Sequence, residues 1–407
     1  MTPPQRSILL YLHAHQPYRI RHYSIFDIGA NHQYFNDSKE GADTNNRFLI
    51  EKIAEKSYRP MNAMLQQLLD EHDRFAFSLS ITGTLLEQLE QWAPDVIESF
   101  QRLARSGRME VVGETYHHSL AFFYDRGEFE AQVQRHKQKI QDVFEQTPVV
   151  FRNTELAYNN ELAVWAEQAG YRAVLAEGWD PILGWRSPNF VYRPAGTEHI
   201  KLLLKNYKLS DDIAFRFSTQ DWEGWPLTAE KYNHWLEALP ADQPLINLFM
   251  DYETFGEHQW ESTGIFDFMS QLPKEFLHSD GHNFLTLSQA AERNEAKDTL
   301  DIPHTVTWAD TDRDLSAWLG NPMQHEAVRN LYALAESILS SDDLTLIEDW
   351  RRLQTSDHLY YMCTKWFNDG DVHAYFSPYD TPYEAFINFN NALHDLKFRL
   401  SESGREV

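Results

Sequence analysis

Short apolar runs that stop abruptly at polar residues recur along the chain, and amphipathic stretches separate them. The runs of strand length lie at Ile8–Leu12, Phe75–Ile81, Met109–Val112, Val149–Phe151, Tyr171–Leu175, Ile200–Leu204 and Leu245–Met250, with Phe284–Leu287 as a further candidate. Between them, apolar residues recur at helical spacing, as at Met61, Leu65 and Leu68, where Pro60 is expected to open a helix. Because strands that alternate with helices build parallel sheets, the pattern predicts an α/β fold.

Residues capable of chemistry follow several of these strands rather than precede them. His13 and His15 follow the first strand, Gly113–His118 (GETYHH) follows the third, and Glu155 follows the fourth. A (β/α) barrel carries its active site at the carboxyl ends of its strands, in the loops that follow them. We therefore expect a closed barrel of seven or eight strands rather than an open sheet.

The pattern changes after about Arg293, where strand-like runs give way to helical spacing alone. This spacing is found in Ala327–Leu339, Leu346–Leu353, Asp357–Trp366 and Tyr383–Leu400. We expect a barrel domain over residues 1–293 and a helical C-terminal domain over residues 294–407 that packs on it. The segment His22–Asn46 shows no clear periodicity and is expected to be a long loop on the side of the barrel that carries His13 and His15.

Two acids that stand directly after apolar strands are the main catalytic candidates. Arg152 and Asn159 lie near Glu155 in the sequence and would favour its ionised form. Asp251 ends an apolar run, and desolvation there would raise its pKa, as an acid catalyst requires. Two strands that each carry a carboxylate at the same end can place both groups on one acetal bond. In a retaining enzyme the two carboxyl groups lie about 5–5.5 Å apart. Alternatively, both are ordinary acids that end strands, cap helices or pair with arginines.

Histidines form two further candidate pairs. His13 and His15 alternate on an extended strand, so both side chains point the same way. That geometry suits a metal, as in amidohydrolases, and equally suits hydrogen bonds to sugar hydroxyls, while a structural role is as frequent for either histidine alone. Of the adjacent His117 and His118, only one can face the cleft.

Aromatic residues make up 14% of the chain, with 12 Trp, 19 Tyr and 25 Phe. This excess suggests flat surfaces on which sugar rings stack, although most tryptophans in proteins are core or rim residues. Trp260 is favoured because it follows the Asp251 loop closely. The other candidates are Trp179, Trp185, Trp222, Trp225, Trp308 and Trp318, while Asp312 and Asp314 could be surface acids.

Charge and cysteine content exclude several classes of function. The formal net charge is −25, from 36 basic and 61 acidic residues, which disfavours binding to nucleic acids and anionic membranes. Cys363 is the only cysteine, which excludes an intrachain disulfide framework and a thiolate metal cluster. The first residues lack the pattern of a signal peptide or membrane span, so we expect a cytoplasmic protein. Nucleotide-phosphate motifs and the G-x-S-x-G elbow are absent.

Five segments, in order, resemble the sequence blocks of glycoside hydrolase family 57, and within it the short α-amylase-type members. They are LHAHQP (Leu12–Pro17), GETYHH (Gly113–His118), FRNTELAYNN (Phe151–Asn160), FMDYETFGEH (Phe249–His258) and WADTDRDLSAWLGNPMQ (Trp308–Gln324). Each block is a weak signal alone, but together they run through most of the chain.

This resemblance implies an incomplete, seven-stranded (β/α) barrel followed by a helical domain, and a retaining mechanism. We expect this reaction to need no cofactor and no catalytic metal. By the same resemblance, Glu155 is the nucleophile and Asp251 is the acid/base. The residues implied to bind the sugar are His13, His15, His117, Asp314 and Trp318. Larger relatives that transfer glucans or build branches carry extra domains, for which 407 residues leave little room.

Residues and resemblance together predict retaining hydrolysis of α-1,4-glucosidic bonds in α-glucans or maltooligosaccharides. The nearest alternative is a 4-α-glucanotransferase, which uses the same carboxylates with a sugar as acceptor in place of water. An alternative of another chemical class is a metal-dependent amidohydrolase or deacetylase with His13 and His15 as ligands. A non-catalytic glucan-binding protein is the remaining alternative.

Overall fold

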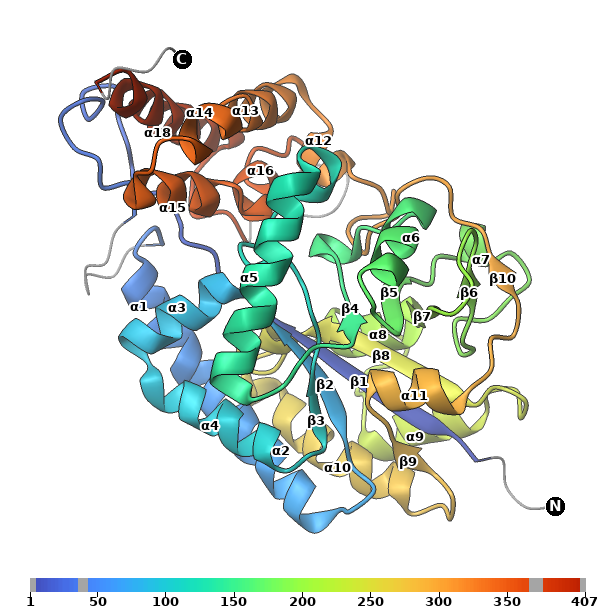
Figure 1. The fold of residues 1–407 in the computed structure, drawn as a ribbon. Helices are drawn as coiled ribbons and strands as arrows, with labels where there is room; N and C mark the ends of the chain where they lie inside the picture. Colours follow the sequence, from blue (N-terminus) through green and yellow to red (C-terminus); the bar gives the residue numbers. More distant parts are fainter. Residues whose placement is uncertain (1–4, 36–42, 366–375, 403–407) are drawn as a thin grey trace.

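Parallel strands form the centre of the molecule, and helices surround them (Figure 1). The computed structural model describes residues 5–35, 43–365 and 376–402. The predicted α/β class is confirmed, and the fold is an incomplete seven-stranded (β/α) barrel with a helical region. The barrel strands are β1 (Ser7–Ala14), β2 (Phe77–Ile81), β3 (Met109–Val111), β4 (Val150–Phe151), β5 (Ala173–Glu177), β7 (Lys201–Lys205) and β8 (Leu245–Asp251).

Two parallel sheets supply the wall of the barrel. One runs in the order β3-β2-β1-β8 and the other in the order β4-β5-β7. A parallel bridge between Gly113 and Phe151 joins β3 to β4, whereas β7 and β8 meet where the Asn206 N–H donates to the Asn247 carbonyl over 3.0 Å. Without a ladder between β7 and β8 in the described chain, the ring stays incomplete. The short strands β6 (Arg193–Pro194) and β10 (Thr299–Leu300) pair with each other outside it.

Helices cover the outer face of the barrel and bury the apolar side chains of the strands. Leu10, Leu12, Leu79 and Ile246 belong to the largest core cluster, which the first helices complete. These outer helices are α1 (Asn46–Ile53), α2 (Arg59–Glu71), α3 (Gly83–Trp92), α4 (Pro94–Arg105), α5 (Arg126–Phe144), α6 (Asn160–Gln168), α7 (Asp180–Leu183), α8 (Tyr207–Ala214), α9 (Ala229–Glu237), α10 (Ile265–Leu277) and α11 (Leu287–Arg293). No described helix combines the length and apolar character that a membrane crossing requires.

The C-terminal helices form a separate layer at one end of the barrel, here called the helical unit (Figure 1). It has its own core around the buried Trp318 and Trp350, and Tyr23 and Tyr34 from the long N-terminal loop join that core. The domain boundary at residue 293 stays a prediction. The helical unit comprises α12 (Ser316–Leu319), α13 (Pro322–Tyr332), α14 (Ala335–Leu339), α15 (Leu344–Leu353), α16 (Ser356–Tyr360) and α18 (Pro382–Glu402).

Some predicted elements differ from those in the structure. The last of the predicted strands, β9 (Asn283–Phe284), is shorter than expected because Thr286 caps α11, whose first residue is Leu287. Pro60 stands in the first turn of α2, as expected, but a π-helical segment, Ala54–Tyr58, joins α1 to α2 directly. Proline is tolerated there because a π-helical turn already interrupts the regular hydrogen-bond ladder.

The expected helices of the C-terminal region also change. The stretch expected as one helix over residues 327–339 divides into α13 and α14 near Ala333. The helix expected over residues 357–366 is the short α16, and residue 366 lies outside the described residues.

The register of β1 brings the first candidate side chains into one layer. His13 pairs with Ser80 of β2 on one side and with Asp251 of β8 on the other. Parallel strands end at the same face of the barrel. His13 and Asp251 are therefore neighbours at the carboxyl ends of their strands, where the helical unit covers the barrel.

Candidate active site

A cavity of about 380 Å³ opens at the carboxyl ends of the strands and is here called the central cavity. Its lining comes from the barrel strands, from the loop that follows residue 307 and from the helical unit. The candidates that line it are His13, His15, Glu155, Asp251 and Trp318, together with His118, Lys205, Asp211, Glu253, Trp308, Arg313 and Asp357. The two acids predicted as a pair therefore face one space.

Glu155 stands in a short 3-10 turn, Thr154–Leu156, which begins three residues after the end of β4. Its backbone lies in the left-handed region with φ 59°, and His118 has a φ of 53°. Such conformations cost about 1–2 kcal/mol for a residue with a Cβ and concentrate at functional sites. With this backbone conformation the Glu155 side chain lines the central cavity, where it is only partly buried.

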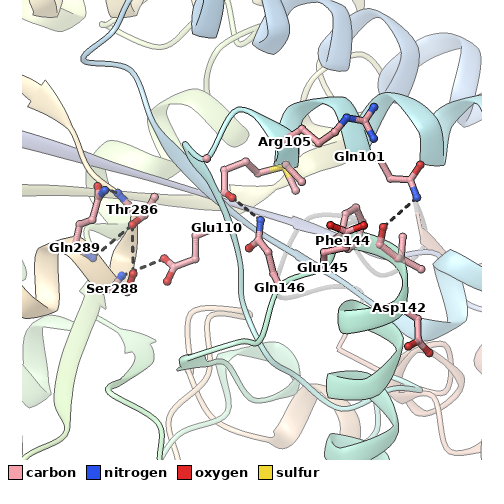
Figure 2. Close-up of a pocket in the computed structure, with 14 residues that line it drawn as sticks. Gln101, Arg105, Glu110, Asp142, Phe144, Glu145, Gln146, Thr286, Ser288 and Gln289 are labelled. Carbon is pink, nitrogen blue, oxygen red and sulfur yellow. Dashed lines mark hydrogen bonds between the residues drawn. The ribbon is translucent and has the colours of Figure 1, made fainter.

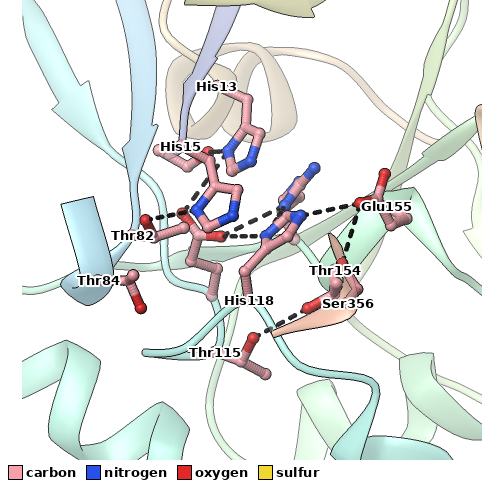
Figure 3. A network of polar contacts seen from close by, with 12 residues as sticks. His13, His15, Thr82, Thr84, Thr115, His118, Thr154, Glu155 and Ser356 are labelled. Carbon is pink, nitrogen blue, oxygen red and sulfur yellow. Dashed lines mark hydrogen bonds and ion pairs between the residues drawn. The ribbon is translucent and has the colours of Figure 1, made fainter. Parts of the chain in front are cut away.

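Three donors hold the Glu155 carboxylate, and Figure 3 shows two of them, His118 and Ser356. Its Oε1 accepts hydrogen bonds from His118 Nε2 over 3.0 Å and from Ser356 Oγ over 3.1 Å. Its Oε2 accepts one from Trp308 Nε1 over 2.9 Å. Burial raises the pKa of Glu155, but the bond and charge of His118 outweigh it, and the pKa lies below its ordinary value. Glu155 is therefore held as a carboxylate.

His118 carries the charge that stabilises this carboxylate. Its Nδ1 lies 3.6 Å from Glu114 Oε2, and Arg152 Nη1 lies 3.3 Å from the same oxygen. Burial lowers the pKa of His118, but Glu114 and Glu155 outweigh it and raise that pKa to about 9. Glu114 and Arg152 are completely buried, so this group of charges is shielded from water.

Asp251, at the end of β8, has the opposite shift. Burial and the charge of Glu155 raise its pKa to about 6. Two residues on, Glu253 is held by the Tyr58 hydroxyl and the His15 N–H, and burial with the charge of Asp251 raises its pKa to about 8. Near neutral pH the cavity thus contains an ionised Glu155 beside acids that bind protons readily.

His13 and His15 form a stack with His118. The ring centroids of His15 and His118 lie 4.1 Å apart and those of His13 and His118 lie 5.0 Å apart. His15 Nε2 donates to Asp357 Oδ2 over 3.0 Å, while burial and nearby charges lower the pKa values of His13 and His15. His13 Nε2 is buried without a hydrogen-bond partner among the described residues. Both rings are neutral hydrogen-bonding groups in the cavity wall.

Among the residues that the structure describes, two groups of side chains have the composition of a metal site. They are His13, Glu114 and His118, and His15, His118 and Asp357, with ligand atoms within 4.8 Å of one another. A metal lies near the plane of each imidazole that binds it, because the nitrogen lone pair lies in that plane. The stacked rings are only 21° and 26° from parallel, so their lone pairs do not converge on one ion. The arrangement favours hydrogen bonding to a substrate over metal binding.

The structure does not bring every predicted residue to the central cavity. His117 is fully buried behind the wall, where Arg135 Nη1 lies 3.0 Å from its Nε2, and its neighbour His118 faces the cavity instead. Trp260 is 59% exposed beside Lys56 and lies outside the lining. Asp314 also lies outside it and accepts hydrogen bonds from Ser316, whereas Trp318 lines the cavity. The positions of these three residues do not support the sugar-binding roles predicted for them.

The sequence did not indicate several residues that line the cavity or bond to its acids. Ser356 and Asp357 come from the helical unit, about two hundred positions after Glu155, and no local pattern indicates them. Lys205 and Arg313 form ion pairs with the buried Glu177, over 3.8 Å and 2.7 Å. The sequence offered one signal for this cluster: Glu177 and Lys205 are polar residues at the ends of the apolar strands β5 and β7, where a barrel carries its active site.

A second cavity, of about 570 Å³, lies at the opposite, amino-terminal end of β3 (Figure 2). Glu110 projects toward it and accepts hydrogen bonds from Ser78 Oγ and the Ser288 N–H, both over 3.0 Å. None of the predicted site residues lines this cavity. The candidate chemistry therefore belongs to the smaller, central one.

Comparisons with known proteins agree with this arrangement. The model of "Glycosyl hydrolase family 57" matches residues 9–303. The chain is 40% identical over 368 residues to a protein of Methanocaldococcus jannaschii named "Putative alpha-amylase", covering 88% of this chain and 78% of that protein.

Solved structures share the fold at low sequence identity. A 4-alpha-glucanotransferase from Thermococcus litoralis superposes with a TM-score of 0.67 at 15% identity, over 88% of this chain and 56% of that chain. An alpha-amylase from Thermotoga maritima gives a TM-score of 0.60 at 14% identity, over 99% of this chain and 100% of that chain. The match to the second protein spans the barrel and the helical unit together.

Proposed function

The chain belongs to glycosyl hydrolase family 57, and on this premise we propose that it hydrolyses α-1,4-glucosidic bonds of maltooligosaccharides and α-glucans with retention. The observation that carries the proposal is the opposite pKa shift of two acids in one cavity. The pKa of Glu155 lies below its ordinary value, while the pKa of Asp251 is raised to about 6. A nucleophile must be ionised and an acid catalyst protonated at the same pH, and these environments supply both. The name of the Methanocaldococcus jannaschii relative supports the amylase type.

In the first step Glu155 attacks the anomeric carbon while Asp251 gives its proton to the departing glycosidic oxygen. The product is a glycosyl ester of Glu155. In the second step Asp251, now a carboxylate, takes a proton from water as that water attacks the same carbon and releases Glu155. His13 Nε2, which lacks a partner among the described residues, is available to a sugar hydroxyl.

The charges of the central cavity favour a neutral sugar. Among the described residues, its lining includes the carboxyl groups of Glu155, Asp211, Asp251, Glu253, Asp310 and Asp357, and the cations Arg19, Lys205 and Arg313 together with the charged His118. Arg313 and Lys205 are already paired with Glu177 and Asp211. With Asp251 and Glu253 protonated and His118 charged, the charges of the lining nearly balance, and an uncharged glucan suits such a cavity.

The test is incubation of the purified protein with maltotriose, with products resolved by size and by anomeric form. We expect glucose and maltose, with the α-anomer released first, and a loss of about a thousand-fold or more in Glu155→Gln. Products longer than maltotriose would indicate glucan transfer instead. Full activity in Glu155→Gln, or the β-anomer first, would contradict the proposal.

A chelator separates hydrolysis by carboxylates from the deacetylase alternative. Because the stacked histidines do not direct their lone pairs at one ion, we expect prolonged dialysis against EDTA to leave maltotriose cleavage unchanged. Activity that is lost on dialysis and restored by zinc would favour a metal-dependent mechanism.

A further inference from the structure

We propose that His118, Ser356 and Trp308 are positioning residues that present Oε2 of Glu155, and not Oε1, as the atom that attacks the sugar. This inference rests on the function proposed above. It assigns a role to three residues that belong to three distant parts of the chain: the loop after β3, helix α16 of the helical unit, and the loop after residue 307.

The two oxygens of Glu155 differ in how many donors they meet. A carboxylate oxygen offers about two lone pairs in the plane of the group. Oε1 accepts hydrogen bonds from His118 Nε2 and Ser356 Oγ, and these two bonds occupy both of its lone pairs. Oε2 accepts only from Trp308 Nε1 among the described residues. One lone pair of Oε2 thus stays available to a carbon atom in the cavity.

Each of the three donors is held in place by contacts of its own. The Ser356 N–H donates to the His118 carbonyl over 2.9 Å, which ties two of the donors together. The Trp308 N–H donates to the Glu155 carbonyl over 3.2 Å, and the guanidinium of Arg152 lies 5.1 Å from the Trp308 ring centre. Arg313 Nη1 donates to the Trp308 carbonyl over 2.8 Å. The carboxylate therefore has little freedom to exchange its two oxygens by rotation.

His118 also holds the charge of Glu155. Its Nδ1 faces the buried Glu114, which stabilises the imidazolium, and its Nε2 faces Glu155. In the reaction, the bond from Oε2 to the anomeric carbon forms as the glycosidic C–O bond breaks and the proton of Asp251 moves to the departing oxygen. The negative charge of Glu155 is consumed at Oε2, while Oε1 becomes the ester carbonyl and keeps its two donors.

The direct test is a crystal structure of the trapped glycosyl-enzyme. Asp251→Asn is incubated with 5-fluoro-α-maltosyl fluoride, whose fluoride leaves with the bonding electrons and needs little acid assistance. We expect the ester bond on the oxygen nearest Trp308 Nε1, with the carbonyl oxygen still bonded to His118 and Ser356. An ester on the oxygen that faces His118 would overturn the assignment.

Kinetics of α-maltosyl fluoride cleavage tests the positioning roles, because this substrate isolates the attack by Glu155. Trp308→Phe and Ser356→Ala each remove one donor, and we expect kcat to fall about 10- to 100-fold with KM changed far less. Trp165→Phe is the matched control, since Trp165 Nε1 donates to Glu130 over 3.2 Å outside the cavity. Wild-type kcat in both cavity variants would overturn the proposal.

The pH profile distinguishes positioning by His118 from a merely structural role. Loss of the imidazolium in His118→Asn raises the pKa of Glu155, so the acid limb of kcat/KM moves to higher pH. His32→Asn removes a histidine–carboxylate pair with Asp395 that lies outside the cavity lining, and it leaves that limb in place. An unmoved acid limb in a folded His118→Asn overturns the role of His118, and if that variant does not fold, the variants of Trp308 and Ser356 decide.

The failures of the two proposals can be told apart. A wild-type protein that does not cleave maltotriose, or an active Glu155→Gln, defeats the proposed function. A wild-type enzyme that needs Glu155 but is indifferent to Trp308, Ser356 and His118 defeats only the present inference.

Discussion

Asp251 supplies the proton that the proposed reaction uses first, so its ionisation sets the upper pH limit of activity. Burial and Glu155 raise its pKa to about 6, while the pKa of Glu155 is lowered. The working form, with Asp251 protonated and Glu155 ionised, disappears as the pH rises through the pKa of Asp251. We expect kcat/KM on maltotriose to fall about tenfold per pH unit above about pH 6. A profile that is flat to pH 8 would contradict this.

Coupling between the two acids gives a second prediction for single residues. Because the negative charge of Glu155 is one of the causes that raise the pKa of Asp251, we expect Glu155→Gln to lower that pKa. Carbon-13 NMR of the Asp251 carboxyl carbon measures it in both proteins. Glu90→Gln, which changes an exposed acid paired with Lys139, serves as the control and leaves the titration unchanged. An identical titration in Glu155→Gln would show that the acids do not interact.

At the level of single residues, the strand pattern indicated Glu155 and Asp251 because each ends an apolar run, and both line the central cavity. It could not choose between His117 and His118. That choice depends on the left-handed backbone of His118, with φ 53°, and alternation along an extended strand does not apply to such a loop. Trp260 was favoured for its nearness in sequence to Asp251, but the chain turns at Gly256 before reaching it and leaves its ring in solvent.

The turn after β8 is the element that sets the position of Glu253 and its neighbours. Gly256 adopts φ +105°, and a Cβ there would lie 1.9 Å from the Lys56 carbonyl oxygen. Gly256→Ala must therefore push the turn away from the π-helical segment that joins α1 to α2. We expect a loss of about 3 kcal/mol or more in the free energy of unfolding, measured by urea denaturation, with reduced kcat.

Gly264→Ala is the matched control for this turn. Gly264 also has positive φ, at +84°, but a Cβ there would meet nothing within 4 Å. Backbone strain alone is expected to cost about 1 kcal/mol. Equal losses in the two variants would show that the contact with Lys56 contributes nothing.

Strands were easier to predict than their limits. Long apolar runs such as β1 and β8 stand out. Every residue of β1 after the first is buried, and so is every residue of β8 before the last. β4 has only two residues, Val150–Phe151, and was recognisable because polar residues follow it at once. The end of β9 was missed because Thr286 forms a capping box with Gln289, which starts a helix inside an apolar run.

For the whole molecule, the sequence predicted a barrel and a helical region but not that the helical unit completes the cavity. Ser356 and Asp357 reach Glu155 and His15 across the boundary between the two parts. Contacts between residues so far apart leave no periodic signal, since they depend on how the parts dock. The docking is therefore part of the site and should influence activity.

The ion pair between Glu128 of α5 and Arg351 of α15 connects the barrel to the helical unit. Arg351 donates to both oxygens of Glu128, over 3.0 Å and 3.1 Å, and Glu128 is buried. Glu128→Ala leaves a guanidinium poorly paired, so we expect a loss of about 3–5 kcal/mol in the free energy of unfolding. Because α15 leads into Ser356, we also expect a lower kcat under conditions where the variant is folded.

Glu161→Ala provides the control for this link between the two parts. Glu161 pairs with Arg126 on the surface and is 72% exposed, so its removal is expected to change the free energy of unfolding by about 0.5 kcal/mol or less. Urea denaturation of both variants, followed by tryptophan fluorescence and by maltotriose cleavage, measures stability and activity together. If the docking of the helical unit holds the active site in place, Glu128→Ala loses maltotriose cleavage at a lower urea concentration than the one at which its tryptophan fluorescence reports unfolding. If the two signals are lost together, the helical unit and the barrel unfold as one body and the ion pair acts on stability alone.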